Sequence, residues 1–471
     1  MRFIPKSYPY NSWQFWLIGI GLVLLVAVPR LTALNQYRIV DEADRWRWAE
    51  DFVLALNNGD LAATRVGDGY PGIVPVWAES IWVFGEAARR SLLEGGWIGD
   101  AGLGKLFHEW DRSAYLYQQR LPIVLLNTAL ALAIIWVTWR LFGRRVALLS
   151  GLLIALDPFY LSDSRVNRAE AVITGFMTLS ILFLIYYGRK KQFRYVLLSA
   201  ICGGLSFLTK IQALAILPAI ALAGGWIVFA DKSDGSAWSL NKERVRRLGE
   251  LGIAWALIAA ATWVALWPAM WVTPLETLDL VYGYATRKVG AEGVKLFFMG
   301  ETFEDIDPGP IFYPFVLLMR TTPLTVLGLL AAAIVPWRWR GRTKPGAWPP
   351  TTGSAILLTY VVVYALAMTL GSHKQDRYLM PIFLALDILA ALGLVFAWAW
   401  LKEKLEVGSR KYEVGDKNRT PYSLLLTSPV LKSVLFAGAF AVQLAAVLPH
   451  HPYYYSYFNP LFGGGATAVR T

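Results

Sequence analysis

Long apolar segments, separated by stretches rich in Lys and Arg, dominate the sequence. About 20 apolar residues are enough to cross the hydrocarbon core of a bilayer as one helix. Eleven segments can be read in this way, so the pattern predicts an all-α polytopic membrane protein with about 11 transmembrane helices. Seven of them have clear limits, at 13–33, 121–142, 146–161, 251–270, 355–370, 381–400 and 434–448.

The apolar stretch 195–230 is too long for one crossing, and Thr209 and Lys210 mark its middle. We therefore divide it into a hairpin of two spans. Without this division, the basic loop around 242–247 would lie on the same side as the acidic first loop, against the positive-inside rule. The resulting topology places the N-terminus in the cytoplasm and the C-terminus outside, with segment 13–33 as a retained signal anchor.

Two hydrophilic stretches, 35–119 and 271–312, are too long to be tight connections, and we expect them to form folded external loops of a single transmembrane domain that covers 1–471. A glycine-rich sequence at 67–72 breaks the first loop sharply, and an aromatic helix is predicted at 76–90. The chain ends soon after three glycines, and this abrupt end is consistent with a missing C-terminal extension.

Within the first loop, apolar residues recur near helical spacing opposite charged residues. This pattern predicts an amphipathic helix that lies on the membrane surface. The apolar positions are Ala43, Trp46, Val53 and Leu56.

Composition supports the membrane assignment. Of 471 residues, 56% are hydrophobic and 17% are charged, which is too apolar for a soluble protein. The net charge of +12 reflects basic loops at span ends, so no nucleic-acid partner is predicted. A single cysteine, Cys202, excludes a disulfide framework within the chain. Four scattered histidines do not form a metal cage, so no metal site and no cofactor are assigned, and a divalent metal stays an open question.

Unusual charged residues converge on the predicted external side. Carboxylates there can accept a proton from an acceptor hydroxyl, while guanidinium and ammonium groups neutralise a phosphate leaving group. The sequence has no phosphate-binding loop of the GxxxxGKS type, so a lipid phosphate fits better than a nucleotide. The residues are Asp41, Glu42, Arg165, Arg168, Glu170, Lys210, Lys374 and Arg377.

Each group also has a plainer interpretation. The acidic pair is equally typical of a helix start. Arg165 and Arg168 are also typical of arginines that reach lipid headgroups, with Glu170 as an ion-pair partner. Lys210 is equally typical of a hairpin tip, and Lys374 to Arg377 of an interfacial charge cluster. Acidic residues near Asp307 are common in solvated loops and also suit an acceptor groove, while tyrosines 453–457 suggest an aromatic belt.

Several stretches, taken in order, resemble one protein family. They are Asp41-Glu42, "NNGDLAATRVGDGYPGIVPVW", "RLFGRRVALLSGLLIALDPFYLSDSR", "SHKQDRYLMPIFLALDILAALGL" and "PYYYSYFNPLFGGG". The set resembles the phospholipid-carrier-dependent glycosyltransferases, which are similar to protein O-mannosyltransferases and lipid A aminoarabinose transferases. This resemblance implies a GT-C fold and a polyprenyl-phosphate-linked sugar donor.

The resemblance also implies roles for particular residues. Asp41 corresponds to the catalytic base, and Glu42 to its neighbour in the acidic pair. Basic residues of the donor site correspond to Arg165, Arg168, Lys374 and Arg377, next to Tyr378. Tyr70 replaces an expected His, and Glu170 replaces an expected Asp; both, with Asp307, are candidate contacts of the sugar or the acceptor.

These observations predict a glycosyltransferase of a prokaryotic inner membrane. We expect it to transfer one sugar, with inversion, from a polyprenyl-phosphate carrier to a hydroxyl of a protein, lipid or glycan on the extracytoplasmic face. Two alternatives are a transporter or flippase of a lipid-linked or anionic solute, and a non-catalytic subunit of a membrane complex with the same fold.

Overall fold

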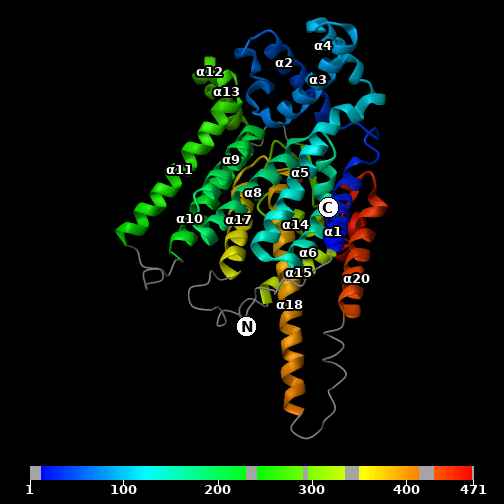
Figure 1. The fold of residues 1–471 in the computed structure, drawn as a ribbon, viewed down its shortest axis with the longest axis vertical. Helices are drawn as coiled ribbons and strands as arrows, with labels where there is room; N and C mark the ends of the chain where they lie inside the picture. The colour runs from blue at the N-terminus through cyan, green and yellow to red at the C-terminus, as the bar shows by residue number, and fades with distance from the viewer. Residues whose placement is uncertain (1–11, 230–240, 290–294, 335–349, 413–428, 469–471) are drawn as a thin grey trace.

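The computed structural model describes residues 12–229, 241–289, 295–334, 350–412 and 429–468. Most of these residues form a helical bundle, with a smaller helical cap at one end (Figure 1). The bundle helices are α1 (Ser12–Leu31), α5 (Leu116–Phe142), α6 (Arg144–Ala155), α7 (Pro158–Ser164), α8 (Ala169–Lys190), α9 (Arg194–Thr209), α10 (Leu217–Phe229), α11 (Lys242–Leu266), α14 (Phe312–Arg320), α15 (Pro323–Ile334), α17 (Pro350–Leu370), α18 (Phe383–Tyr412) and α20 (Pro429–Val447).

The cap comes from the two predicted hydrophilic loops. Its main helices are α2 (Val40–Asn57), α3 (Ile73–Glu94) and α4 (Gly99–Trp110), together with α12 (Ala269–Val272) and α13 (Pro274–Val289). The antiparallel strands β1 (Lys295–Phe298) and β2 (Glu301–Glu304) form the one sheet in the described residues. The all-α architecture is thus confirmed, with one short hairpin added.

The spans fall where the hydropathy pattern places them. Seven described helices are long and apolar enough to cross a membrane. Two bent pairs, α6 with α7 and α14 with α15, raise this number to nine if each pair is one span. Two shorter apolar helices, at Trp16–Leu31 and Arg194–Thr209, occupy the remaining predicted positions. The number of membrane crossings itself stays a prediction.

The division of the stretch 195–230 is confirmed. Helix α9 ends at Thr209, Lys210 has an extended backbone, and the chain resumes in the 3₁₀ helix η4 (Ile211–Ile216) before α10. The polar pair at 209 and 210 thus interrupts an otherwise continuous apolar run.

Three expectations about helices are wrong in detail. The third span is bent by 63° at Asp157, where Pro158 begins α7. A proline at a helix start lacks the N–H that would continue the preceding helix, which favours such a break. Helix α18 continues to Tyr412, beyond the predicted end of its span at residue 400. The helix predicted at 76–90 extends over all of α3.

The amphipathic helix of the first loop is α2, but its apolar face does not lie open toward a membrane. Trp46 and Val53 are buried against α3 and α4. The Trp46 indole donates a hydrogen bond to the Phe107 carbonyl oxygen over 3.2 Å, and its ring lies 4.8 Å from the Phe107 ring. Protein therefore covers the face that the sequence assigned to lipid.

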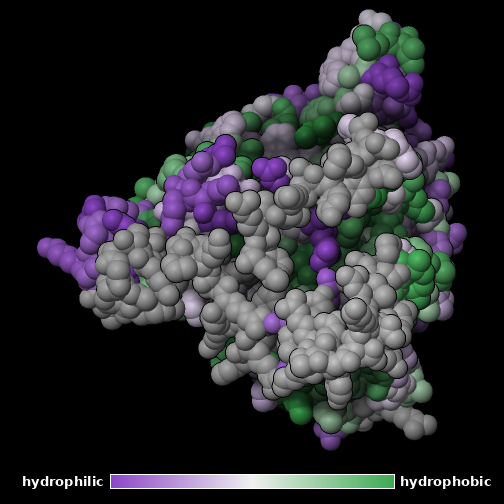
Figure 2. All heavy atoms as spheres, turned by 60° about the horizontal axis from the view of Figure 1, so that its bottom comes forward, coloured by the Kyte–Doolittle hydropathy of each residue, from purple (hydrophilic) through white to green (hydrophobic). Residues whose placement is uncertain are grey.

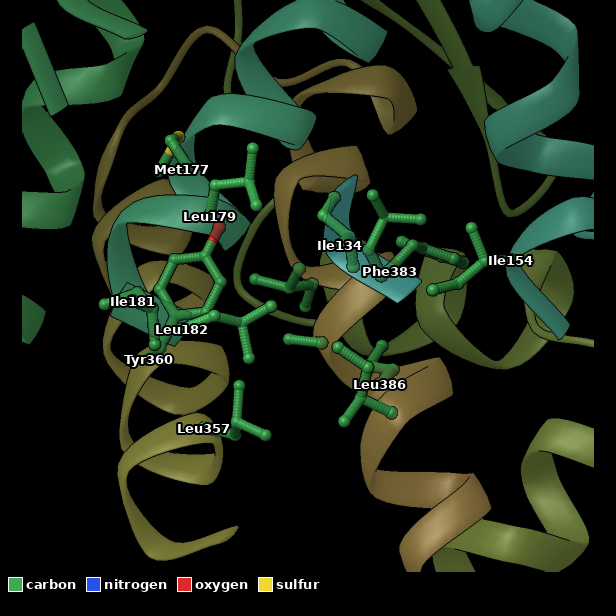
Figure 3. Packing of buried hydrophobic residues seen from close by; sticks show 14 of the residues in the cluster. Ile134, Ile154, Met177, Leu179, Ile181, Leu182, Leu357, Tyr360, Phe383 and Leu386 are labelled. Carbon is green, nitrogen blue, oxygen red and sulfur yellow. The ribbon is translucent and has the colours of Figure 1, made fainter. Parts of the chain in front are cut away.

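Helix α8 is the centre of the bundle, with 94% of its most apolar window buried. Side chains from α5, α6, α8, α17 and α18 meet in one apolar core, and Figure 3 shows Ile134, Ile154, Met177, Tyr360 and Phe383 among them. Because the first turn of α8 lies at the end of the bundle that carries the cap (Figure 1), a rigid element positions the residues at that end.

Basic residues gather at the opposite end of the bundle, as the topology argument requires. Figure 2, in which that end is turned toward the viewer, shows hydrophilic side chains on the side where α11 begins in Figure 1. Helix α11 contributes exposed Arg246 and Arg247, paired with Glu243 and Glu250. Their position supports a cytoplasmic assignment for this end, which stays a prediction.

A close crossing of α15 and α18 depends on two glycines. A Cβ atom on Gly393 would lie 2.0 Å from the Gly328 carbonyl oxygen, so the backbones touch there, as small residues allow in membrane bundles.

We expect Gly393→Ala to destabilise the bundle by about 1–3 kcal/mol, measured as a lower thermal unfolding midpoint in detergent. Gly438→Ala in α20 is the control, because an added Cβ meets no atom within 4 Å; equal midpoints for the two variants would contradict this packing.

Candidate functional site

Asp41 lies in the first turn of α2, at the boundary between the cap and the bundle. Its Oδ2 atom is 3.1 Å from Arg168 Nε and 3.2 Å from Arg377 Nη1. Arg168 immediately precedes α8, and Arg377 belongs to the 3₁₀ helix η5 (Asp376–Ile382) before α18. Three segments far apart in the sequence therefore meet at one carboxylate, which is 36% exposed.

A second carboxylate, Glu170, lies in the first turn of α8. Its Oε1 atom is 2.7 Å from Lys210 Nζ and 3.2 Å from Arg377 Nε. Arg168 also binds Asp163, with 3.1 Å between Nη1 and Oδ1. The paired groups form one network, the ion cluster, which consists of Asp41, Asp163, Arg168, Glu170, Lys210 and Arg377.

The ion cluster contains three carboxylates and three cations, and its members differ sharply in exposure. The side chains of Asp163 and Glu170 are 1% and 4% exposed, whereas Asp41 is far more accessible. Charges this deeply buried are stable only when they are paired. Tyr378 closes one side of the cluster, because Lys210 Nζ lies 4.5 Å from the centre of its ring.

Glu42 has a different environment from Asp41. It is fully buried, and its Oε2 atom is 2.7 Å from Arg120 Nη2. The same carboxylate accepts hydrogen bonds from the backbone N–H groups of Ile39 over 3.0 Å and Asn167 over 2.9 Å. The helix-start interpretation therefore describes Glu42, which joins α2 to α5 and to the loop before α8.

Arg45 and Tyr70 form a second buried group beside the ion cluster. The Arg45 guanidinium carbon lies 4.1 Å from the centre of the Tyr70 ring and 4.7 Å from that of Trp48. Arg45 Nη1 has no hydrogen-bond partner among the described residues. Asp41 and Glu170 attract its charge electrostatically. Burial raises the pKa of Tyr70 to about 12, although Arg45 acts in the opposite direction, so the phenol stays neutral.

Glycine conformations hold Tyr70 in this position. Gly69 has a φ of +92°, and a Cβ there would lie 2.3 Å from the Leu280 carbonyl oxygen of α13. Only glycine combines this left-handed backbone with so close an approach. The Tyr284 ring of α13 also contacts Tyr70, with 5.6 Å between ring centres, so the second hydrophilic loop packs directly on the first.

Two residues assigned to the donor site by sequence, Arg165 and Lys374, have their printed partners outside the ion cluster. The Arg165 guanidinium donates hydrogen bonds to the carbonyl oxygens of Thr32, Ala33 and Pro452, an arrangement that holds chain segments together and differs from the expected phosphate contact. Lys374 Nζ is 2.6 Å from Asp307 Oδ1, so this cation pairs with the second hydrophilic loop.

Other residues of the site were missed by sequence reasoning. The sequence shows no unusual charge pattern and no residue spacing that would have indicated a functional role for Arg45, Asp163 or Arg120. Glu79 of α3 accepts a hydrogen bond from the Asn167 side chain and is 1% exposed. Its position in an aromatic helix was the single available signal, since a carboxylate on a buried face is unusual.

Within the described ranges, no three His, Cys, Asp or Glu side chains lie close enough to hold a metal ion. The acidic residues near Asp41 are instead separated by cations. The ion cluster can accept a proton at Asp41 and can bind an anion through its cations, and metal dependence stays open.

Comparison with known proteins places this geometry in context. Residues 103–267 match the family model described as dolichyl-phosphate-mannose-protein mannosyltransferase. The crystal structure of ArnT from Cupriavidus metallidurans bound to undecaprenyl phosphate superposes with a TM-score of 0.55 and 17% sequence identity, over 94% of this chain and 78% of that chain. This protein has the GT-C fold. The apo structure of the same ArnT gives a TM-score of 0.54 and 16% identity, over 93% of this chain and 77% of that chain.

No curated protein sequence matches the chain. The GT-C assignment therefore rests on the fold and on the partial family match, and both agree with the resemblance seen in the sequence motifs. The protein is therefore a helical membrane protein of GT-C architecture, and roles of individual site residues are proposed from their geometry.

The buried Glu79 predicts a pH dependence of stability. Burial raises its pKa well above the ordinary value, against opposing effects of Asn167 and Arg45. The folded state therefore keeps this proton at pH values where the unfolded chain, with a pKa of about 4.3, has lost it. Stability is full below the unfolded pKa and decreases as pH rises toward the folded pKa.

We expect Glu79→Gln to reduce this loss, so that the unfolding midpoint of the variant exceeds that of the wild type by more at high pH than at low pH. Glu86→Gln is the control on the same helix. Arg89 and Arg90 lower the pKa of Glu86 to about 2, which is below the pH range in which Glu79 affects stability. Parallel pH profiles for the wild type and Glu79→Gln would contradict the buried neutral acid.

Proposed function

We propose that the protein transfers a sugar from a polyprenyl-phosphate carrier to an acceptor hydroxyl on the extracytoplasmic face, with inversion at the anomeric carbon. Asp41 accepts the proton of the acceptor hydroxyl. The acceptor oxygen forms a bond to the anomeric carbon while the bond from that carbon to the phosphate oxygen breaks. The electron pair leaves with the phosphate, which remains on the lipid.

The exposure of Asp41 carries this proposal. Among the three carboxylates of the ion cluster, only Asp41 combines an accessible side chain with two arginine partners. Arg168 and Arg377 hold its carboxylate in one orientation, and a base must have a fixed position relative to the hydroxyl that it deprotonates. The buried Glu170 instead holds Lys210 and Arg377 in place.

The cations support a phosphate as the leaving group. Arg168 and Arg377 are 14% and 21% exposed, so both border the region around Asp41. Lys210 lies behind them on Glu170. Arg45, whose Nη1 atom has no hydrogen-bond partner among the described residues, adds a fourth positive charge to a cluster that is neutral without it, which favours the binding of one further anion. A planar guanidinium matches phosphate geometry.

Other proposed contacts follow from the same arrangement. Tyr70 and Tyr284 offer neutral aromatic faces next to Arg45, suited to a sugar ring or to the acceptor. Tyr378 supports Lys210. Asp307 of the second hydrophilic loop pairs with Lys374, and this pair can border an acceptor groove. We propose that the acceptor is a protein, a lipid or a glycan. The transferase itself lies in the bilayer of a prokaryotic inner membrane.

A transporter or flippase of a lipid-linked solute is the second candidate, because two spans are broken and broken helices are frequent in transporters. The position of the ion cluster favours transfer, since its charges gather at one end of the bundle beside the cap. A transporter requires no general base, so the first experiment distinguishes the two.

We expect Asp41→Asn to lower transfer by about 10²–10⁴-fold, because the amide cannot accept the proton. Transfer of radiolabelled sugar from polyprenyl phosphate to acceptors is measured in membranes that contain equal amounts of inserted protein. Asp44→Asn is the control, since Asp44 is exposed and pairs with Arg47 on the same helix. Normal transfer by Asp41→Asn would exclude this base.

We expect Arg45→Met to weaken binding of undecaprenyl phosphate by about 10–100-fold, the range for losing a hydrogen bond to a charged group. Arg47→Met serves as the control, because Arg47 is 69% exposed. The unfolding midpoint shows whether each variant is folded. An unchanged affinity in folded Arg45→Met would remove Arg45 from the donor site.

A further inference from the structure

Two carboxylic acids lie inside the spanning bundle, apart from the ion cluster. Asp387 belongs to the first turns of α18, and Asp157 lies at the bend between α6 and α7; they are 1% and 2% exposed. Three further polar side chains lie next to them, Thr322 and Thr325 at the start of α15 and Gln443 of α20. All five are buried.

Asp157 has the partners of an ionised carboxylate. Its Oδ1 atom accepts a hydrogen bond from Tyr160 N–H over 2.9 Å at the start of α7, where the helix dipole favours negative charge. Arg30 of α1 attracts it electrostatically. The Arg30 guanidinium in turn donates to the carbonyl oxygens of Ile154 over 3.3 Å and Ala155 over 3.4 Å, so Asp157 has both a hydrogen-bond donor and a nearby cation.

Asp387 has no such compensation. Its Oδ1 atom is 3.0 Å from Thr325 Oγ1, and its Oδ2 atom has no hydrogen-bond partner among the described residues. The charged group that acts on it is Asp157, which carries the same sign. An isolated ionised carboxylate in an apolar interior is very costly, whereas the neutral acid is not.

The hydrogen-bond chain that begins at Asp387 gives an independent count of protons. Gln443 Nε2 donates to the Leu156 carbonyl oxygen over 2.9 Å, which leaves Gln443 Oε1 to accept from Thr322 Oγ1 over 3.2 Å. The two threonine hydroxyl oxygens are 3.0 Å apart. If Asp387 were ionised, Thr325 would donate to it, Thr322 would donate to Gln443, and no hydrogen would lie between the threonines.

One added proton places a hydrogen in every contact of this chain, while Asp387 Oδ2 remains without a hydrogen-bond partner among the described residues. A protonated Asp387 donates to Thr325, which donates to Thr322, which donates to Gln443, and the amide donates to the Leu156 carbonyl. Each group then donates once in a single direction, and such chains are cooperatively strengthened. We propose that Asp387 and Asp157 together form an intramembrane site that binds one proton, carried by Asp387.

This site connects the two bent spans. The Gln443 amide binds the residue just before the α6–α7 bend, and Thr322 lies at the bend between α14 and α15. Helix α7 leads to Arg168, and Arg320 of α14 binds Asp376 beside Arg377 over 2.7 Å. The proton site does not depend on which reaction the cluster performs. The titratable and charged groups around it are Arg30, Asp157, Tyr160 and Tyr457.

Infrared spectroscopy of the full-length protein in lipid tests this assignment directly. The difference spectrum of the wild type minus Asp387→Asn should contain a protonated-carboxyl C=O band that shifts in D₂O. The matched Asp157→Asn spectrum should show loss of a carboxylate band and no loss of the protonated band. A carboxylate band in the Asp387→Asn difference spectrum would overturn the proposal.

Thermal unfolding separates a proton from a metal cation. Asp387→Asn should unfold close to the wild-type midpoint, because the neutral amide donates to Thr325 in the same direction, whereas Asp387→Leu should lose several degrees. The wild-type midpoint should be equal in sodium chloride and choline chloride. A midpoint that rises with sodium and loses this dependence in Asp387→Asn would show a sodium site in place of the proton.

Discussion

The structure depends on the pairing of charges that a membrane bundle would otherwise exclude. Each buried ion costs several kcal/mol unless a partner and hydrogen bonds compensate it. Arg168 is the clearest case, because it lies between the buried Asp163 and the exposed Asp41 and so joins the bundle to the cap. Glu42 and Arg120 make a second such connection. These pairs, together with the apolar contacts of Phe52 and Ile73 with Leu208, hold the cap on the bundle, and Asp41 lies in the first helix of the cap.

The cap and the bundle have different stabilising interactions. Aromatic contacts around Trp46 and Phe107 hold the cap together, while α8 provides a buried axis for the bundle. The boundary between them has an apolar part, where Phe52 and Ile73 of the cap pack with Leu208 of the bundle, and a polar part that contains side-chain atoms without partners among the described residues, such as Arg45 Nη1 and Glu79 Oε2. A boundary of this kind can exchange internal hydrogen bonds for contacts with a polar ligand, which suits a site that must bind and release a lipid phosphate.

Carboxyl groups with and without compensating partners lie a short distance apart in this fold. Asp157 accepts a hydrogen bond from the Tyr160 N–H and lies near Arg30, whereas Asp387 Oδ2 has no hydrogen-bond partner among the described residues. At the boundary, two arginines pair with Asp41, whereas Glu79 Oε2 has no partner in the described part of the chain. Local partners, more than residue type, therefore distinguish the carboxyl groups of this protein.

The sequence by itself determined the apolar helices, the division at Lys210, the two hydrophilic loops and the gathering of Asp41 with Arg168 and Arg377, because hydrophobicity and local charge are properties of short segments. The resemblance already separated Asp41 from Glu42, but the sequence did not reveal the carbonyl contacts of Arg165, and it missed Arg45 and Asp163. Only the tertiary structure decided these roles. Burial and pairing depend on residues such as Arg377, which lies 336 positions from Asp41 in the chain. No local sequence pattern predicts that two residues so far apart are in contact.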